Sequence, residues 1–197
     1  MPKKLKKTPL TFSEQLIQVK DVEGLRSVLG IADPWHYIIV GDGSAQTWEH
    51  FAGWASILID SGDLIPQVFT GAMSAGTNIM CEMLAFIHPL WKLASIKRVE
   101  QAEVHIVTDC QPVQNSGNGK VERKKNREMW FMVDAFRRKG LNLHFHYIPR
   151  DTLSLNKLAH DLANAARKTH EYAMPKLLKS SLAIQEATTV ADLCPND

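Results

Sequence analysis

Apolar residues gather in short runs through the middle of the chain, and glycines or acidic residues separate the runs. Three runs rich in β-branched and aromatic residues predict strands at Tyr37–Asp42, Phe51–Asp60 and Ile65–Thr70. Because turns with Gly and Asp join them, we expect an antiparallel meander. Two later runs, Val104–Asp109 and Leu141–Ile148, predict two further strands.

Most segments before, between and after these strands have apolar residues at helical spacing. This spacing predicts helices at Thr77–Ala94, Lys124–Arg138 and Leu155–Ala166, and a helical extension over Thr11–Leu29 that Gly24 interrupts or weakens. Pro89 should kink the first of these helices or end its regular part. The order of the main elements is therefore βββαβαβα. The crossover through a helix implies that the fourth strand lies parallel to a neighbour.

The chain divides into three parts. Residues 1–34 hold a basic tail and the helical extension, residues 35–172 form one α/β domain, and residues 173–197 are a C-terminal extension without an expected role. No apolar run approaches the roughly 20 residues of a membrane-spanning helix. The N-terminus also lacks the apolar stretch of a secretory signal. We therefore expect a soluble, intracellular and cytoplasmic protein.

Composition excludes several classes of protein but does not identify one. Of 197 residues, 45% are hydrophobic and 22% are charged, which excludes a largely disordered, collagen-like or disulfide-scaffold protein. The 23 basic and 21 acidic residues give a net charge of +2. That balance alone does not indicate a nucleic-acid binder, so the local distribution of charge has to decide the question.

Neither cysteines nor histidines form an evident zinc site. The three cysteines contain no C-x-x-C pair and are odd in number, which also argues against a disulfide framework. His144 and His146 alternate on one predicted strand and so share a face, as two zinc ligands would. The sequence offers no evident third ligand, so ordinary surface or core histidines are the favoured interpretation.

Four acidic residues stand among apolar neighbours: Asp42 and Asp109 at strand ends, Glu82 and Asp161 in helices. A carboxylate on a buried face is costly unless it is paired or binds a metal. Four converging carboxylates would repel one another, so we expect divalent cations between them, and oxygen ligands favour Mg²⁺ or Mn²⁺. Two such ions about 3.5–4 Å apart can bind the attacking water and the leaving oxygen of a phosphodiester, which indicates a nuclease.

Short motifs surround these four acids. They are Asp42-Gly-Ser44, Thr77-Asn-x-Met-x-Glu82, Thr108-Asp-x-Gln111 and Ala159-x-Asp-Leu-Ala163. One such motif is weak, but four in this order are specific, and over roughly residues 36–170 the chain resembles type-1 ribonuclease H. The resemblance implies the ribonuclease H-like fold with a five-stranded mixed sheet. It also implies two Mg²⁺ ions on the four acids and cleavage of the RNA strand of RNA/DNA hybrids, leaving a 3′-hydroxyl and a 5′-phosphate.

The resemblance also assigns contacts with the substrate. Asn78 and Gln111 match positions that contact ribose hydroxyls in the minor groove, and Glu82 is expected nearest the scissile 2′-hydroxyl. The basic run over residues 120–127 lies near the family's contacts with the DNA strand's phosphates. We expect Lys120, Arg123, Lys124 and Lys125 of this run to contact those phosphates.

One loop departs from the better-known members, which carry a mobile histidine before the last acid. Here the loop contains Ile148-Pro-Arg-Asp151, so we expect Arg150 to contact substrate or to assist product release. His160 adjoins Asp161, but neighbouring helical residues point about 100° apart, so we expect it not to replace the missing histidine.

Two other functions stay open. The same fold and acids serve DNA nucleases, junction resolvases and integrase-like proteins, so the substrate could be DNA. A nucleic-acid or protein binding module could also keep the fold after losing turnover.

Overall fold

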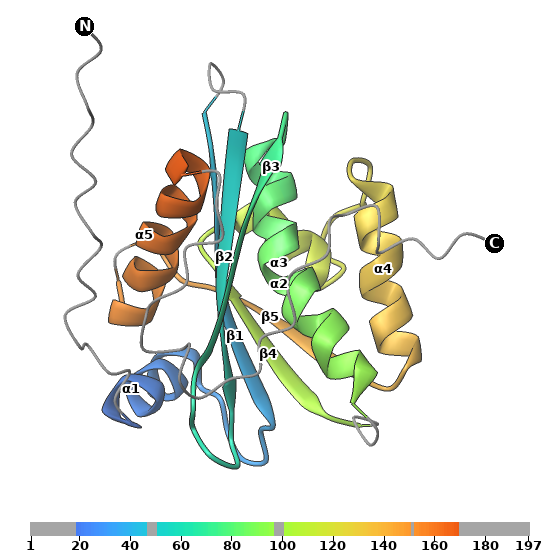
Figure 1. Ribbon diagram of the computed structural model, residues 1–197. Coiled ribbons are helices and arrows are strands. Elements are labelled where there is room, and N and C mark those ends of the chain that lie inside the picture. Colours follow the sequence, from blue (N-terminus) through green and yellow to red (C-terminus); the bar gives the residue numbers. More distant parts are fainter. Residues whose placement is uncertain (1–18, 47–50, 97–100, 151, 170–197) are drawn as a thin grey trace, which may run out of the picture.

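The computed structural model describes residues 19–46, 51–96, 101–150 and 152–169, which form a five-stranded mixed sheet with helices on both faces (Figure 1). The strands are β1 (Tyr37–Ala45), β2 (Phe51–Asp60), β3 (Gln67–Ser74), β4 (Glu103–Thr108) and β5 (Asn142–Tyr147). The helices are α1 (Val19–Leu29), α2 (Asn78–Ser95), α3 (Gln111–Gly117), α4 (Arg127–Arg138) and α5 (Ser154–Thr169). The basic tail, residues 11–18 of the helical extension and residues 170–197 lie outside the described residues.

The strands lie in the order β3-β2-β1-β4-β5. The meander β1-β2-β3 is antiparallel, whereas β4 and β5 run parallel to β1. Tyr37 pairs with Val104 and Val40 with Val107, so the same register continued by two residues places Asp42 beside Asp109. The carboxyl ends of parallel strands meet at one edge of a sheet, which is where open α/β sheets place their sites.

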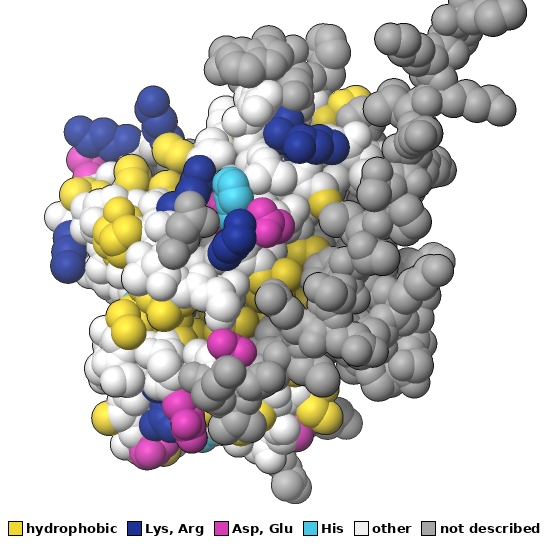
Figure 2. All heavy atoms as spheres, turned by 90° about the vertical axis from the view of Figure 1, so that its left-hand side faces the viewer, with side chains coloured by type: hydrophobic (Ala, Val, Ile, Leu, Met, Phe, Trp, Pro, Cys, Tyr) yellow, Lys and Arg dark blue, Asp and Glu magenta, His cyan; other side chains and the backbone are white. Residues whose placement is uncertain are grey.

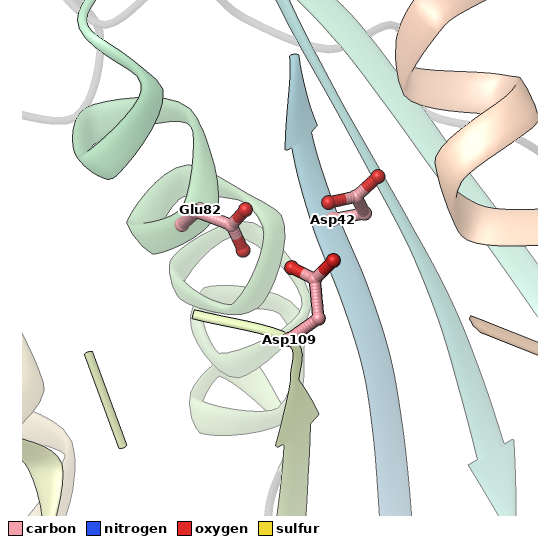
Figure 3. Close-up of side chains that lie close together, drawn as sticks. All are labelled: Asp42, Glu82 and Asp109. Carbon is pink, nitrogen blue, oxygen red and sulfur yellow. The ribbon is translucent and has the colours of Figure 1, made fainter. Parts of the chain in front are cut away.

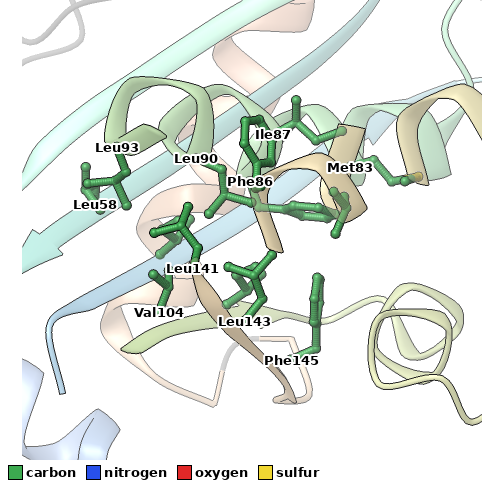
Figure 4. Packing of buried hydrophobic residues seen from close by; sticks show 14 of the residues in the cluster. Leu58, Met83, Phe86, Ile87, Leu90, Leu93, Val104, Leu141, Leu143 and Phe145 are labelled. Atoms are coloured by element: carbon green, nitrogen blue, oxygen red, sulfur yellow. The ribbon is translucent and has the colours of Figure 1, made fainter. Parts of the chain in front are cut away.

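Both faces of the sheet are covered. Helices α2, α3 and α4 lie on one face, and α1 and α5 lie on the other (Figure 1). Ile39 of β1 packs in the core beneath α2 and α4, which includes the edge-on rings of Phe86 and Phe145 (Figure 4). Ile38 belongs to the second core, beneath α1 and α5. Burial on both faces explains the unbroken apolar run at the start of β1.

Two glycines let a helix backbone approach the sheet. A Cβ on Gly43 of β1 would lie 2.5 Å from the backbone nitrogen of Glu82 in α2. A Cβ on Gly53 of β2 would lie 2.3 Å from the carbonyl oxygen of Ala163 and 2.4 Å from the backbone nitrogen of Arg167, both in α5. Since backbone atoms cannot swing aside as a flexible side chain can, these contacts fix where both helices sit against the sheet.

The predicted order of strands and long helices is confirmed, with several differences, among them β3, which spans Gln67–Ser74 and not Ile65–Thr70. The short helix α3 follows β4 and has no counterpart in the predicted elements. Strand β1 continues past Asp42 to Ala45. Helix α2 does not end at Pro89, which lies buried within it, because the helix runs on to Ser95. The division into residues 1–34, 35–172 and 173–197 stays a prediction.

None of the helices in the described ranges combines the length and the apolar character needed to cross a membrane.

Candidate metal centre

Three carboxylates from three elements meet at the carboxyl edge of the central strands. Asp42 lies in β1, Glu82 in the second turn of α2, and Asp109 directly after β4. One oxygen of each lies within 4.8 Å of the corresponding oxygens of the other two, and the three side chains point into a common space (Figure 3). The structure thus brings together three of the four carboxylates that the sequence predicted.

The two most buried of these carboxylates lack full compensation. Asp42 is 3% exposed and Glu82 is 1% exposed. Thr108 Oγ1 donates to Glu82 Oε2 at 3.0 Å, but Glu82 Oε1 and Asp42 Oδ1 accept no hydrogen bond within the described part of the chain. Burial first, and then the neighbouring acids, raises the pKa of Asp42 and that of Glu82. These buried oxygens accept no hydrogen bond from any described residue and lie in a cluster of like charges. A divalent cation bound between them would satisfy both the oxygens and the charge.

Arg150 contacts two of the three carboxylates. Its Nε donates to Asp109 Oδ2 at 2.7 Å, and its Nη2 lies 3.9 Å from Asp42 Oδ1. The Arg150 side chain is half exposed. A guanidinium that is anchored on the centre and still reaches solvent can also contact a bound phosphate.

Helix α5 presents His160, and not Asp161, to the cluster. His160 Nδ1 lies 2.6 Å from Asp42 Oδ2. The Asp161 side chain is 59% exposed, and its nearest ionic partner is Lys157, at 3.5 Å. Neighbouring residues of a helix point about 100° apart, so only one of the two can face β1. The structure therefore does not bring Asp161 to the other three carboxylates, contrary to the expected convergence of four, and its role as a metal ligand stays a prediction. The expectation that His160 does not replace the missing loop histidine also stays a prediction.

A chain of hydrogen bonds holds His160 in place. Asn164 Nδ2 lies 2.9 Å from His160 Nε2, and Ser44 Oγ donates to Asn164 Oδ1 at 2.7 Å. Arg167, which is buried, donates from Nε to Ser44 Oγ at 2.9 Å. His160, Asn164 and Arg167 are spaced i, i+4 and i+7, so they share one face of α5. That polar stripe on an otherwise apolar helix face was the sequence signal that could have revealed them.

The two residues predicted to contact ribose lie next to the carboxylates in the chain. Asn78 is exposed at the start of α2, one helical turn before Glu82. Gln111 is exposed at the start of α3, two residues after Asp109, and its amide donates to Gln114 Oε1 at 2.8 Å. Their role in binding substrate stays a prediction.

The basic run separates into exposed lysines and one structural arginine. Lys120, Lys124 and Lys125 are exposed, and Lys124 lies 3.3 Å from Glu122. Arg123, in contrast, donates to both oxygens of Asp134 at 2.7 and 2.8 Å. Its Nε also donates to the Ser116 carbonyl at 3.0 Å, and its guanidinium lies 4.5 Å from the centre of the Trp130 ring. Arg123 therefore supports the packing of α4, and the phosphate contacts predicted for Arg123 and for the three lysines stay a prediction.

A separate group of histidines lies on β4 and β5. His105 of β4 lies beside His144 and His146 of β5, a contact that the sequence pattern did not predict. Its Nδ1 lies 2.9 Å from His146 Nε2, and its ring stacks on that of His144. His144 Nε2 lies 2.6 Å from Glu103 Oε2. Burial, together with the other two histidines, lowers the pKa of His105 to about 4.

No protein-family model matches this sequence, and a comparison with curated proteins finds no relative. Solved structures do resemble the chain. The N-terminal RNase H domain of a Mycobacterium tuberculosis protein is 19% identical, with a TM-score of 0.57, over 69% of this chain and 96% of that domain. An RNase H1 isolated from compost by a metagenomic approach is 23% identical, with a TM-score of 0.58, over 68% and 96%.

A third example is RNase H1 from the archaeon Halobacterium salinarum. It is 20% identical, with a TM-score of 0.54, over 68% of this chain and 98% of the archaeal protein. These structures share the five-stranded mixed sheet and its helices. Because their sequence identity to this chain is low, the chemistry of the site has to be argued from this chain's own residues. The chain has the ribonuclease H fold.

Proposed function

We propose that the chain is a metal-dependent endonuclease that hydrolyses the RNA strand of RNA/DNA hybrids. The observation that carries the proposal is the cluster of Asp42, Glu82 and Asp109, with two buried carboxylate oxygens that accept no hydrogen bond within the described residues. The compost RNase H1 of the same fold has been solved in complex with an RNA/DNA hybrid. That complex supports a hybrid as the first substrate to test.

The three carboxylates would hold Mg²⁺, or Mn²⁺ in its place. When bound, such an ion lowers the pKa of its water and stabilises the charge that develops on phosphate oxygens. Through such an ion, Asp42 and Asp109 would position the phosphodiester at the edge of the sheet, and Glu82, in the second turn of α2, would be the carboxylate nearest the ribose 2′-hydroxyl. The three carboxylates provide for one ion. The second ion of the predicted pair would need the Oδ2 side of Asp42.

The remaining residues bind and orient the substrate. Asn78 and Gln111 flank the centre and offer amides that can both donate to and accept from a ribose hydroxyl, the group that distinguishes RNA from DNA. Arg150 can hold a phosphate oxygen near Asp109, and Lys120, Lys124 and Lys125 can hold phosphates of the DNA strand.

A labelled RNA/DNA hybrid incubated with Mg²⁺ or Mn²⁺ tests the proposal. We expect cleavage with a 5′-phosphate on the product by the wild type and by Glu23→Gln, a change of an exposed acid on α1. We expect background activity from Glu82→Gln and Asp109→Asn. Wild-type activity equal to that of Asp109→Asn would refute catalysis, and cleavage of single-stranded DNA or four-way junctions in preference to the hybrid would refute the substrate.

One observation favours a second function, a binding module without turnover. Arg150 and His160 already occupy oxygens of Asp109 and Asp42 that a metal or its water could use. Such a module would bind the hybrid with an affinity that does not change when Mg²⁺ is removed, so binding measured with and without EDTA separates the two functions.

A further inference from the structure

The side of Asp42 that faces α5 is occupied by a group of the protein. His160 Nδ1 lies 2.6 Å from Asp42 Oδ2. Asp42 Oδ1, the other oxygen of the same carboxylate, accepts no hydrogen bond within the described residues and lies 3.9 Å from Arg150 Nη2, and the carboxylate belongs to the cluster with Glu82 and Asp109. The two oxygens of Asp42 therefore have different surroundings, one near the Arg150 guanidinium and one against an imidazole.

The hydrogen-bond chain behind His160 decides which ring nitrogen carries the proton. Arg167 Nε donates to Ser44 Oγ, so the Ser44 hydroxyl proton is free to go to Asn164 Oδ1. Arg167 Nη2 lies 3.5 Å from the same Asn164 oxygen. With its oxygen held by these donors, Asn164 directs its NH₂ group at His160 Nε2, which must then be the acceptor. Nδ1 consequently carries the proton and donates to Asp42.

A protonated Nδ1 cannot be a metal ligand, and at 2.6 Å from Asp42 Oδ2 the imidazole occupies the space beside that oxygen in which a second cation would have to lie. Charge leads to the same conclusion. Three carboxylates and the Arg150 guanidinium leave two negative charges, which one divalent ion neutralises.

We infer that the centre binds one divalent cation, between Asp42, Glu82 and Asp109, and that His160 closes the second position as a hydrogen-bond donor to Asp42. This inference rests on the proposed metal centre. His160 is then a positioning residue, and Asn164, Ser44 and Arg167 hold it in that role. The chain thus departs from the two-ion arrangement that the resemblance implied.

Mn²⁺ titration of the full chain, without nucleic acid, tests the inference. Free Mn²⁺ is counted by electron paramagnetic resonance, and nitrogen coupling to bound Mn²⁺ reports imidazole ligands. We expect the wild type and Asp161→Asn to bind one ion per chain without nitrogen coupling. We expect His160→Asp to bind two, because it supplies the fourth carboxylate at the position that faces Asp42.

Asn164→Asp provides an independent variant that keeps the histidine. A carboxylate at position 164 only accepts, so it draws the proton to His160 Nε2 and leaves the lone pair of Nδ1 toward Asp42. We expect two ions per chain, the second with nitrogen coupling. Circular dichroism and thermal melts identify any variant that fails to fold.

The outcomes separate this inference from the proposed function. Two ions in the wild type, nitrogen coupling in the wild type, or one ion in both folded variants would overturn the inference. One ion in the wild type, two in His160→Asp, and no cleavage of any hybrid would support the inference and refute the proposed function. No Mn²⁺ bound by the wild type would refute both.

Discussion

Asp42 and His160 are 118 residues apart in the chain, and their side chains meet at 2.6 Å. The contact joins the central strand of the sheet to the last described helix. Figure 2 faces the side of the molecule that carries α1 and α5, where charged side chains of both signs lie beside a histidine. The last helix therefore places an imidazole, and not the adjacent carboxylate of Asp161, against Asp42.

Asp161→Asn should leave both Mn²⁺ affinity and hybrid cleavage within about twofold of the wild type. The Asp161 side chain is 59% exposed and pairs with Lys157 in a surface contact, and such contacts typically contribute less than about 1 kcal/mol. Metal titration and initial rates measure both quantities. A loss of more than tenfold in either would return Asp161 to the set of metal ligands.

Glu82→Gln should raise the Tm of the protein in EDTA while it lowers hybrid cleavage by roughly 10²–10³-fold. Removing one buried charge from a repelling cluster stabilises the metal-free fold, and about 1 kcal/mol corresponds to roughly 2–4 °C in a domain of this size. Mg²⁺ should raise the Tm of the wild type and leave that of the variant nearly unchanged. Thermal melts with Glu23→Gln as the matched control measure these shifts.

The same cluster sets a pH dependence. The pKa of Glu82 and that of Asp42 are raised in the folded protein. The folded state then holds more protons than the unfolded chain at pH values between the unfolded and the folded pKa, so the free energy of unfolding falls as pH rises through that window. In EDTA, the excess stability of Glu82→Gln over the wild type should therefore be small at low pH and grow as pH rises. If the excess stability of Glu82→Gln did not change with pH, the raised pKa values of Glu82 and Asp42 would be contradicted.

Arg150→Ala should weaken hybrid binding by roughly tenfold or more, the range for one charge-assisted hydrogen bond. Arg150→Lys should recover part of the loss, because it keeps the charge without the two-pronged geometry. Steady-state kinetics separate a change in KM, expected for phosphate contact, from a change in kcat alone, expected for product release. Unchanged values of both would remove Arg150 from the site.

Arg123 and the neighbouring lysines should differ in what their removal affects. Arg123→Ala should lower the free energy of unfolding by about 1–3 kcal/mol, since it leaves Asp134 with only the longer contact to Arg137, at 3.3 Å, and uncovers Trp130. Lys124→Ala with Lys125→Ala should leave stability unchanged and reduce hybrid affinity, with a smaller dependence on salt. Denaturant unfolding and binding at several salt concentrations distinguish the two effects, and Asp134→Ala should reproduce the result of Arg123→Ala.

His105 should make the fold sensitive to acid. Its pKa of about 4 lies below the ordinary value of 6.5, so the unfolded chain binds more protons between these two values. The free energy of unfolding therefore falls as pH drops from 6.5 to 4, and no further loss from this group occurs below that window. His105→Gln should show a smaller decline over the window than the wild type in denaturant unfolding. An identical decline would mean that His88 and His146, whose pKa values are also lowered, carry the effect.

The predictions made from sequence succeeded where a local pattern determined the structure. Asp42 and Asp109 each follow a run of buried β-branched residues, so the parallel pairing of β1 and β4 was enough to bring them together. Helix α3 has seven residues with only Val113 as a buried large apolar side chain, which leaves no periodic signal.

The last helix shows why the remaining part of the site was missed. His160 and Asp161 are neighbours with apolar residues on both sides, and the choice between them depends on a rotation of 100° about the helix axis. That rotation is set by contacts with β2, far away in the sequence. Likewise, Arg123 appeared as one base among five, and only the position of Asp134 shows that it is engaged in packing.

The close contact of α5 with Gly53 has an evolutionary consequence. Backbone atoms of Ala163 and Arg167 lie where a Cβ of residue 53 would be, so the helix cannot turn to exchange one facing residue for the next. Histidine and aspartate codons differ only in their first base. A single base change at codon 160 would therefore convert this centre to four carboxylates, whereas no change at codon 161 could do so. Related sequences can accordingly be sorted by the residue at this one position.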